Sequence, residues 1–409
     1  MGGRTPGVLV VGASAAGLAA ADGLREGGYE GPITVLDDEL TPSYDRPMLS
    51  KGLVASREDV RPSPLRTPDQ LADRRIDVQA GHAAVGLDID RRLLVTNYGE
   101  ALPWSHVVIA TGARARPVLT TAGTALPTLR TVADLEALRS LVTHGKATTI
   151  IGAGFIGLEV AAALRSREVP VTLLRSGPRP LRHVLGDTVS DWLLGVHRSH
   201  GVDLPSESRA VSVEVTETGY DIVLADGTRL AAGPVLAGIG AEPVTAWLAG
   251  SGVDLGDGVW TDAAGRTNVP GVWAAGDVAN AVEVRTGRRR RIEHWTHAIE
   301  QGRHVGLNIA RVGTGEGGAD EPVPFTAVPY LWTEQYGIKL HVLGERRPGD
   351  EDIVVEGDLD SGDVVVVHGA GDEMHSVTIC GRIRALRKYK NLLRSGASMA
   401  EALGAAAPA

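Results

Sequence analysis

The sequence contains, twice, a short apolar run that leads directly into a glycine-rich turn. The first copy is Gly7-Val-Leu-Val-Val-Gly-Ala-Ser-Ala-Ala-Gly17, and the second is Ala147-Thr-Thr-Ile-Ile-Gly-Ala-Gly-Phe-Ile-Gly157. A helical stretch follows each turn, and a second apolar run comes after it, at residues 33–36 and 171–174. A strand, turn, helix and strand in this order is typical of a Rossmann-like unit, so we expect two nucleotide-binding units on one chain.

The two turns can be interpreted in two ways. Glycines at the start of a helix let a pyrophosphate approach the unpaired N–H groups and the positive end of the helix dipole. Glycine-rich turns also occur where a helix only has to pack closely on a sheet. One motif would leave the choice open, but two in the same context favour the binding of two dinucleotides, even though Ser14 replaces the middle glycine of the first.

The residue that ends the second strand of each unit bears on the choice of nucleotide. An acidic residue about 20 positions after the glycines holds a ribose hydroxyl. Asp37 or Asp38 supplies it in the first unit, whereas Arg175 stands at that place in the second. Because an arginine suits a 2′-phosphate, the sequence favours NADPH, or the use of both NADPH and NADH, as electron donor.

The rest of the chain completes these units and adds a third domain. A strand that closes on a glycine ends each unit, and alternating apolar and polar residues predict a β-meander in each. A Gly-rich stretch at 311–320 is expected to be a linker before an α+β domain. The segments are 104–112 and 233–240 for the closing strands, 85–102 and 203–230 for the meanders, 271–277 for a buried strand that ends in Asp277, and 353–355, 364–368 and 384–393 for two strands and a helix after the linker.

Composition excludes several classes of protein. With 409 residues, 43% hydrophobic and 22% charged, the chain is expected to be globular, with about two to four domains. No uncharged run reaches the ~18 apolar residues that span a bilayer, and residues 1–7 lack the apolar core of a signal peptide, so we expect a cytoplasmic protein. A net charge of -9 argues against nucleic-acid or membrane partners. The one cysteine, Cys380, excludes an internal disulfide, a cysteine-rich metal site and two-thiol redox chemistry.

Further motifs follow in order along nearly the whole chain: Tyr44-Asp-Arg-Pro-Met-Leu-Ser-Lys51, Ala110-Thr-Gly-Ala-Arg-Ala-Arg116, Leu129-Arg-Thr131, Gly152-Ala-Gly-Phe-Ile-Gly-Leu-Glu159, Ala275-Gly-Asp277, Glu293-His-Trp295 with Gln301-Gly302, and Pro329-Tyr-Leu-Trp-Thr-Glu-Gln-Tyr-Gly337. With these motifs the sequence resembles the FAD/NAD(P)-linked reductases of the glutathione reductase structural superfamily. More narrowly, it is similar to the ferredoxin reductases that serve bacterial cytochrome P450 and Rieske oxygenase systems, and to rubredoxin reductases.

The resemblance implies an α/β protein with two Rossmann-like nucleotide-binding domains, for FAD and NAD(P)H, plus a C-terminal α+β domain. The FAD domain would be split between 1–115 and 241–318, the NAD(P)H domain would cover 116–240, and the C-terminal interface domain would cover 319–409. For FAD it implies Gly12, Ser14, Ala16 and Gly17 at the pyrophosphate, Asp38 at the adenosine ribose, Arg46, Lys51, Arg130 and the backbone near Ala84 as further contacts, Asp277 at the ribityl chain and Trp295 beside the isoalloxazine. For NAD(P)H it implies Gly152, Gly154 and Gly157 at the pyrophosphate, with Glu159 close to Lys51 and the nicotinamide.

The implied catalytic pair, Lys51 and Glu159, is chemically reasonable. A lysine near the flavin stabilises the negative charge that develops when a hydride arrives, and a carboxylate keeps that lysine protonated and in place. Without the motifs, a surface lysine and a solvated helix residue would be the simpler interpretation. An ordinary core position is the alternative for Trp295, whereas a carboxylate after a buried strand, as at Asp277, needs a partner.

With no second cysteine, electrons must leave the flavin for an external acceptor, and we expect a [2Fe-2S] ferredoxin. Ferredoxins are typically acidic, so the docking face should be basic. Two groups are candidates, although each could be an ordinary solvated segment: Arg285 with Arg288, Arg289, Arg290 and Arg291, and a second group of Arg384, Arg387, Lys388, Lys390 and Arg394. Alternatives are a reductase of rubredoxin or of a small molecule such as monodehydroascorbate, and a redox-sensing flavoprotein similar to apoptosis-inducing factor. We expect no metal site, and a monomer or homodimer.

Overall fold

The computed structural model describes residues 5–54, 56, 61–142, 146–206, 208–313 and 320–405. The chain divides into two compact units. Unit 1 consists of Met1–Asp45, Ser63–Arg114 and Glu242–Ala327, and unit 2 of Arg46–Pro62, Ala115–Ala241 and Val328–Ala409. Unit 2 therefore includes residues 46–62, which the sequence analysis places in the FAD domain. The short helix in this segment, η1 (Leu49–Leu53), contacts helices of the second nucleotide-binding region.

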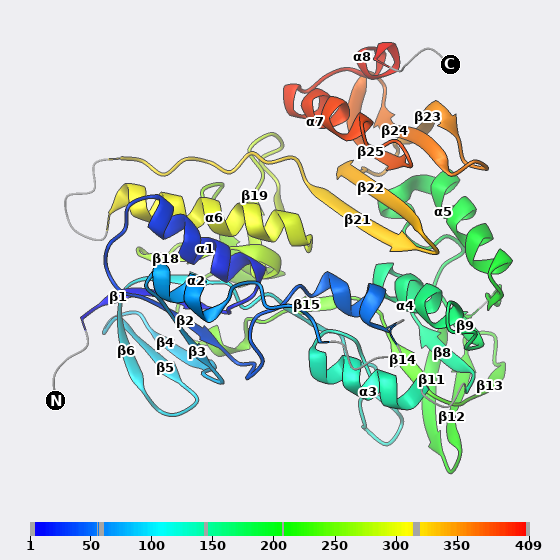
Figure 1. Ribbon diagram of the computed structural model, residues 1–409, viewed down its shortest axis with the longest axis horizontal. Helices are drawn as coiled ribbons and strands as arrows, with labels where there is room; N and C mark the ends of the chain where they lie inside the picture. The colour runs from blue at the N-terminus through cyan, green and yellow to red at the C-terminus, as the bar shows by residue number, and fades with distance from the viewer. Residues whose placement is uncertain are drawn as a thin grey trace. The chain divides into compact units, whose positions relative to one another are not determined.

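Unit 1 is built around a parallel sheet in the order β3-β2-β1-β6, with β18 paired to the outer side of β6 (Figure 1). The strands alternate side chains between two faces, so Val8 and Val10 enter one buried cluster while Leu9 and Val11 enter another. An antiparallel pair, β5 and β4, extends the sheet from β6. The strands are β1 (Gly7–Val11), β2 (Ile33–Asp37), β3 (Ile76–Ala80), β4 (Ala84–Asp88), β5 (Leu93–Thr96), β6 (Ala101–Ile109) and β18 (Val272–Ala274).

Helices α1 (Ala15–Glu26) and α6 (Trp295–Val312) lie side by side in unit 1 (Figure 1). Small residues permit backbone contact between them. A Cβ added at Gly302 would collide with the carbonyl group of Ala16, and one at Gly306 with that of Ala20. The two helices therefore pack against the face of the sheet that carries Val8 and Val10.

The smaller elements of unit 1 surround this core. Helix α2 (Pro68–Asp73) begins with a capping box formed by Thr67 and Gln70. A four-stranded sheet has the order β16-β17-β19-β20. Its strands are β16 (Leu255–Gly256), β17 (Gly258–Thr261), β19 (Ala279–Val282) and β20 (Arg289–Arg291), and two short helices are η2 (Ala246–Leu248) and η3 (Gly276–Val278). Strands β7 (Ala113–Ala115) and β15 (Ala241–Pro243) lie where the chain passes between the units.

Unit 2 repeats the strand, turn and helix arrangement. Its parallel sheet has the order β10-β9-β8-β14, and a separate meander has the order β11-β12-β13. The strands are β8 (Thr148–Ile151), β9 (Val171–Leu174), β10 (Val202–Asp203), β11 (Ala210–Thr216), β12 (Gly219–Leu224), β13 (Arg229–Ala232) and β14 (Val235–Ala237). The helices are α3 (Val132–Val142), α4 (Phe155–Arg165) and α5 (Arg182–Ser199).

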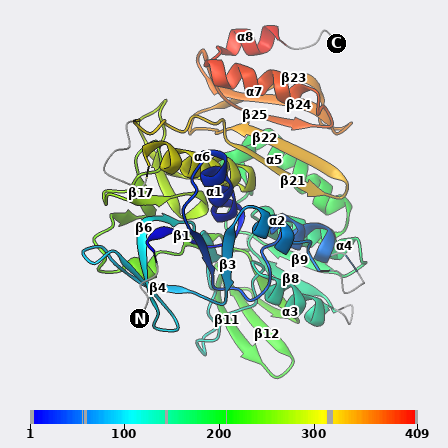
Figure 2. The same cartoon turned by 60° about the vertical axis from the view of Figure 1, so that its left-hand side comes forward.

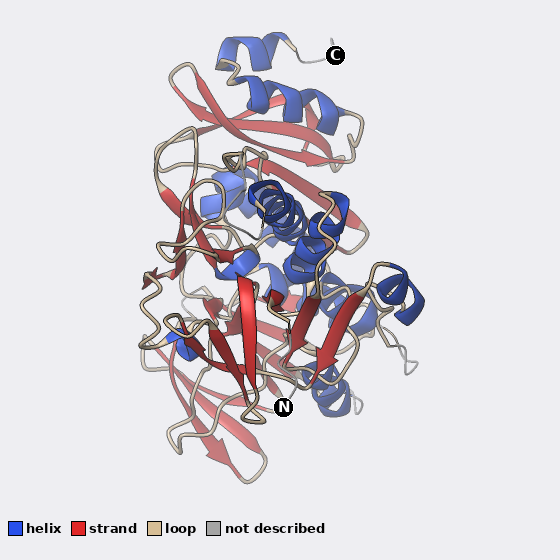
Figure 3. Cartoon of the chain, turned by 90° about the vertical axis from the view of Figure 1, so that its left-hand side faces the viewer, coloured by secondary structure: helices blue, strands red, loops and turns tan. Residues whose placement is uncertain are grey.

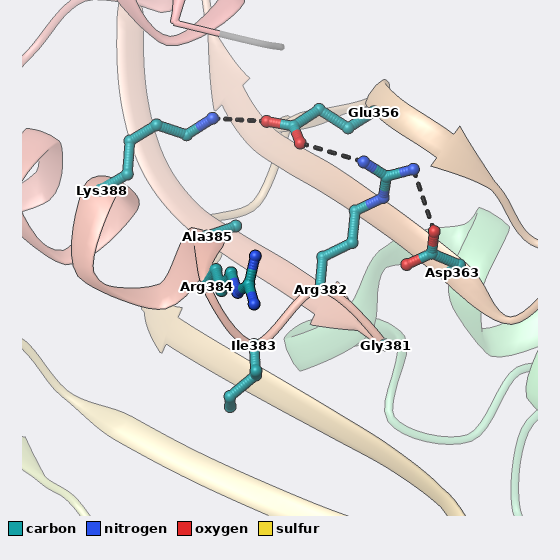
Figure 4. Close-up of a pocket in the computed structure, with 8 residues that line it drawn as sticks. All are labelled: Glu356, Asp363, Gly381, Arg382, Ile383, Arg384, Ala385 and Lys388. Carbon is teal, nitrogen blue, oxygen red and sulfur yellow. Dashed lines mark hydrogen bonds and ion pairs between the residues drawn. The ribbon is translucent and has the colours of Figure 1, made fainter. Parts of the chain in front are cut away.

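The last part of unit 2 is an antiparallel sheet in the order β21-β22-β25-β24-β23, followed by two helices near the C-terminus (Figure 3). Helix α7 lies against this sheet (Figure 2). Its Tyr389 and Leu393 belong to the same buried cluster as residues of the sheet. Glu356, on β23, accepts hydrogen bonds from Lys388 of α7 and from Arg382, which fixes the start of the helix (Figure 4). The elements are β21 (Tyr330–Gln335), β22 (Ile338–Gly344), β23 (Glu351–Asp358), β24 (Asp363–Ala370), β25 (Glu373–Cys380), α7 (Ala385–Ser395) and α8 (Met399–Gly404).

The strands, meanders and helices expected from the sequence are present, with ends that differ by a few residues. One expectation needs a correction at its boundary. The linker expected at 311–320 begins later, because α6 continues through Val312, and residues 314–319 lie outside the described residues. Within the described ranges, no helix is long and apolar enough to cross a membrane.

Candidate functional site

The two glycine-rich turns have the same backbone geometry. Gly12 donates its N–H to the carbonyl of Leu36 at 2.8 Å, and Gly152 donates to the equivalent carbonyl of Leu174 at 2.9 Å. Each turn follows the strand at which the strand order of its sheet reverses, β1 in unit 1 and β8 in unit 2. In open α/β sheets, ligands bind beyond the carboxyl ends of the strands at this point.

In the second turn two glycines are needed for packing, whereas the third has room for a Cβ. Gly152 has φ +113°, and a Cβ there would collide with the carbonyl of Gly238. A Cβ at Gly157 would collide with the carbonyl of Gly152. At Gly154, by contrast, the only neighbour within 4 Å among the described residues is the carbonyl oxygen of Gly238, at 3.9 Å. Gly154 precedes α4 as its N-cap, so this space lies against the unpaired N–H groups of a helix. The turn fits the pyrophosphate of a dinucleotide.

The first turn follows the same plan. Gly12 has φ +106°, and Gly17 packs against its carbonyl. Ser14 takes the place of Gly154 as the N-cap of α1, with an extended backbone. Ala16 is buried, and a Cβ at Gly276 would come within 2.7 Å of its side chain. In Ala16 the side chain thus serves packing, which leaves only its backbone for the predicted contact with FAD.

The residues after β2 and β9 differ in their surroundings. Asp38 is exposed, and its carboxylate has no hydrogen-bond partner in the part of the chain that the structure describes, so it is available to a ligand. Arg175 is 8% exposed and donates from Nη1 to the carbonyl oxygens of Gly177 and Pro178, both at 2.8 Å. Burial lowers the pKa of the Arg175 guanidinium. Arg175 therefore holds the loop after β9 in its present conformation.

Asp277 and Trp295 lie at two helix starts in unit 1. Asp277 is in η3, where the N–H of Gly276 donates to Oε1 of Gln301 at 2.8 Å, and the carbonyl of Asp277 accepts from Arg291 at 3.1 Å. Trp295 is the first residue of α6 and packs partly against the core. Burial lowers the pKa of the adjacent His294 to about 4, so this histidine is neutral at pH 7.

The structure brings Lys51 and Glu159 together. Lys51, on η1, has its Nζ 3.0 Å from Oε1 and 3.1 Å from Oε2 of Glu159 on α4. The carboxylate also accepts hydrogen bonds from the hydroxyl groups of Ser50 and Thr333. Glu159 is 3% exposed, so the simpler interpretation of a solvated helix residue is wrong. A buried carboxylate with three donors is a fixed acceptor beside a cation.

Three further residues predicted to contact FAD are Arg46, Arg130 and Ala84, and the first two make hydrogen bonds within unit 2. Arg46 donates from Nη1 to the carbonyl of Arg130 at 2.9 Å. The N–H of Arg130 donates to Asp134 at 2.8 Å, at the start of α3. Ala84 is the first residue of β4 in unit 1.

Four residues around Glu159 were not predicted from the sequence: Ser50 and Thr333 donate to its carboxylate, Gln335 donates to Thr333, and Nε2 of His197 lies 2.7 Å from Oε1 of Gln335. Ser50 precedes Lys51 in a motif that was recognised, so the motif was a usable indication. Thr333 and Gln335 are two positions apart on β21 and therefore face the same side, while the exposed Glu334 between them faces the other, and this spacing was a usable indication. Nothing in the sequence distinguishes His197 from other helical histidines.

Comparison with known proteins identifies the family of this chain. Residues 6–302 match the pyridine nucleotide-disulphide oxidoreductase family, and residues 330–408 match the reductase C-terminal domain. The chain belongs to the pyridine nucleotide-disulphide oxidoreductase family. Among curated proteins it is 35% identical, over 88% of this chain and 86% of the relative, to the ferredoxin–NAD(+) reductase component of the biphenyl dioxygenase system of Paraburkholderia xenovorans. It is 32% identical to putidaredoxin reductase of Pseudomonas putida, over 94% of this chain and 91% of that protein.

Solved structures agree with this membership. The ferredoxin reductase of the CYP199A2 system from Rhodopseudomonas palustris has a TM-score of 0.89 at 28% identity, covering 97% of this chain and 96% of that chain. The reductase in a covalent putidaredoxin reductase–putidaredoxin complex has a TM-score of 0.85 at 31% identity, covering 96% and 94%. The predicted fold class is confirmed, as is the prediction of FAD with a nicotinamide dinucleotide donor; the relatives named here point to NADH.

The disulphide chemistry in the family name has no counterpart in this member. Its one cysteine, Cys380, is on β25 and 2% exposed. Burial raises the pKa of the Cys380 thiol to about 11, so the thiolate is scarce at neutral pH. A single inert thiol cannot form the dithiol of a disulfide reductase.

The arginines predicted to dock a partner differ in their contacts. Arg289 stacks over Trp260, with 5.1 Å between the guanidinium carbon and the ring centre. Arg290 pairs with Glu283 at 3.1 Å, and the Arg291 side chain is only 8% exposed. Arg288 is exposed and has no ion pair with any residue that the structure describes. Of the four, Arg288 is the most available to a partner.

Proposed function

We propose that this chain transfers electrons from NADH through FAD to a [2Fe-2S] ferredoxin that serves a cytochrome P450 or Rieske oxygenase. The observation that carries the proposal is the match, over most of its length, to reductases named for ferredoxin. The lack of a cysteine pair supports it, because electrons that reach the flavin have no internal disulfide to reduce.

The overall reaction balances without any other reactant. NADH gives a hydride and becomes NAD⁺, two ferredoxin molecules each take one electron, and one proton goes to solvent. When bound, FAD supplies the chemistry that accepts electrons in a pair and releases them singly. The protein binds the dinucleotides, orients them and places charge.

We assign residues to these tasks as follows. The room for an added Cβ at Gly154 supports pyrophosphate binding at the second turn, and the equivalent N-cap position of Ser14 at α1 supports it at the first. The free carboxylate of Asp38 supports a ribose contact. The ion pair of Lys51 with Glu159 supports the role predicted for it, in which the lysine stabilises negative charge at the flavin during hydride transfer. We retain Gly12, Ala16 and Gly17 for FAD, Gly152 and Gly157 for the nicotinamide dinucleotide, and Arg46, Ala84, Arg130, Asp277 and Trp295 as further FAD contacts.

The contacts of Arg175 bear on the choice between NADH and NADPH as electron donor. To bind a 2′-phosphate, its guanidinium would have to leave the carbonyl groups of Gly177 and Pro178. That cost, together with relatives named for NAD(+), supports NADH as the donor. The NADPH preference predicted from the sequence is then one outcome of the test below.

Within the group Arg288–Arg291, we propose that Arg288 contributes most to docking of the ferredoxin. We expect Arg288→Ala to lower ferredoxin-dependent cytochrome c reduction and to weaken its dependence on salt, with ferricyanide reduction unchanged. Arg209, also an exposed arginine, provides the matched control, and Arg209→Ala should change neither activity. Equal loss of both activities in Arg288→Ala would refute docking at this site.

The proposed function is tested by anaerobic stopped-flow reduction of the purified protein with NADH and with NADPH. A [2Fe-2S] ferredoxin and cytochrome c are then added. Rapid flavin bleaching with ferredoxin-dependent cytochrome reduction is the expected result. Bleaching with transfer only to rubredoxin or monodehydroascorbate would support the alternative reductases. Slow turnover, with dimerisation on addition of dinucleotide, would support a redox sensor.

We also propose the split arrangement of an FAD domain at 1–115 and 241–318, an NAD(P)H domain at 116–240 and an interface domain at 319–409. A cytoplasmic location and a monomeric or homodimeric state complete the proposal. Light scattering of the purified protein, with and without NADH, measures the oligomeric state.

A further inference from the structure

A row of buried polar side chains leads away from Glu159 within unit 2. Thr333 Oγ1 lies 2.6 Å from Oε1 of Glu159, and Gln335 Nε2 lies 3.0 Å from Thr333 Oγ1. Gln335 Oε1 lies 2.7 Å from His197 Nε2, and the hydroxyl of Tyr336 lies 3.1 Å from His197 Nδ1. The row thus connects α4, β21 and α5 through four consecutive hydrogen bonds.

The burial of this row calls for an explanation. Thr333 is 1% exposed, Gln335 is 2% exposed and His197 is 0% exposed. Apolar side chains of similar size would fill the same volume without the cost of removing polar groups from water. Thr333 and Gln335 are two apart on β21, so both face α4 and α5. Their polarity is useful only if the hydrogen bonds themselves have a role.

All four hydrogen bonds run in the same direction. A carboxylate only accepts, so Thr333 must donate to Glu159, and its hydroxyl oxygen then accepts from the amide of Gln335. The amide oxygen of Gln335 accepts from Nε2–H of His197. Burial lowers the pKa of His197 to about 4, so the ring is neutral and its Nδ1 accepts from Tyr336. Every donor points toward Glu159, and each bond polarises the next.

We propose that Thr333, Gln335 and His197 are positioning residues that keep the Glu159 carboxylate turned toward Lys51. Because Thr333 occupies Oε1, rotation of the carboxylate away from Lys51 would break a hydrogen bond of 2.6 Å. Gln335 and His197 in turn fix the hydroxyl of Thr333 in its donating orientation. This inference rests on the proposed function of the Lys51 and Glu159 pair in hydride transfer.

The test removes one hydroxyl group with little change of shape. We expect Thr333→Val to lower the limiting rate of flavin reduction by NADH about 10-fold, as loss of one hydrogen bond to a charged group predicts. The dissociation constant for NADH should stay unchanged, because the pyrophosphate turn is intact. Thr333→Ser retains the hydroxyl and should restore most of the rate, which a merely structural role of the threonine methyl group would not do.

A matched control is available in the same sheet. Thr378 is fully buried, and its hydroxyl pairs with His368 at 2.9 Å, outside the row. Thr378→Val removes a comparable hydrogen bond and should leave the rate of flavin reduction unchanged. An equal loss of rate in Thr333→Val and Thr378→Val would overturn the proposal, as would a normal rate in Thr333→Val.

A second variant keeps the proposal testable if Thr333→Val does not fold. Gln335→Met has a similar size and removes the donor to Thr333, and we expect a loss of about 3-fold that Thr378→Val does not show. Glu159→Gln distinguishes a failure of the proposed function of the ion pair from a failure of the positioning role alone. If Glu159→Gln reduces flavin at the normal rate, the proposed function of the pair fails; if only Glu159→Gln is slow, the positioning role fails alone.

Discussion

Gly154 provides the sharpest test of the second nucleotide site, because this glycine is not needed for packing. Substitution Gly154→Ala adds one methyl group whose only neighbour within 4 Å, among the described residues, is the Gly238 carbonyl at 3.9 Å. That is an ordinary contact distance. The residue is a helix N-cap with an extended backbone, φ -76°, which alanine adopts without strain. The free energy of unfolding should therefore change by less than about 1 kcal/mol.

The effect on NADH binding should be much larger. The methyl group would occupy the space in which a phosphate meets the N–H groups at the start of α4. A hydrogen bond to a charged group contributes about 1.5–3 kcal/mol, and ~1.4 kcal/mol corresponds to a tenfold change in affinity. Loss of one such bond predicts a dissociation constant for NADH that is about 10- to 100-fold higher.

The assay is the dependence of the flavin-reduction rate on NADH concentration, measured anaerobically, with a thermal melt of each variant. Gly195, exposed on α5 with no neighbour within 4 Å in the described structure, is the matched control. Gly195→Ala should leave NADH binding unchanged. Unchanged NADH affinity in Gly154→Ala would refute the placement of the pyrophosphate, and an unfolded Gly154→Ala would favour the alternative in which the turn serves packing alone.

Three other predictions concern Lys51, His197 and the contact between helices α1 and α6. Lys51→Met should slow flavin reduction about 100-fold with little change in NADH affinity, measured by the same stopped-flow method, because it removes the positive charge that we propose to lie beside the flavin; a normal rate would contradict the role of Lys51. Burial lowers the pKa of His197 from 6.5 to about 4, so the unfolded chain binds a proton between these values that the folded chain excludes. Stability is therefore lost as pH falls from 6.5 toward 4, by about 3 kcal/mol for His197, and urea unfolding of His197→Gln should show a smaller decline; equal declines would contradict this. Gly306→Ala places a methyl group against the Ala20 carbonyl and should lower the melting temperature and flavin content, whereas wild-type values for both would contradict close contact of α1 and α6.

The parts of the fold that could be predicted are those that depend on local order along the chain. A strand, a glycine turn and a helix are adjacent in sequence, so residues 7–17 and 147–157 sufficed to identify two nucleotide-binding units. Lys51 was predicted only through the resemblance of its motif to a known family. What local order could not show is which glycine has room opposite it, because Gly152 and Gly154 look alike in sequence and differ only in what lies opposite them.

Contacts between distant segments were beyond the sequence argument. Thr333 and Glu159 are separated by 174 residues, and His197 and Gln335 by 138. No periodicity links such pairs, since each depends on how β21 packs against α4 and α5. The arginine group stays a prediction, but charge along the sequence does not reveal that Arg291 is engaged with Asp257 and Glu293 while Arg288 is exposed.

The surroundings of Glu159 explain why the two matched regions of the chain depend on each other. Lys51, Ser50 and Glu159 lie in the region that matches the oxidoreductase family, whereas Thr333 lies in the reductase C-terminal domain. Without Thr333, one oxygen of a carboxylate that is 3% exposed would lose a donor in surroundings where water cannot replace it. The C-terminal domain therefore contributes a hydrogen bond to the pair proposed for hydride transfer, and a change on β21 should alter the chemistry even though β21 carries none of the glycines proposed to bind dinucleotide.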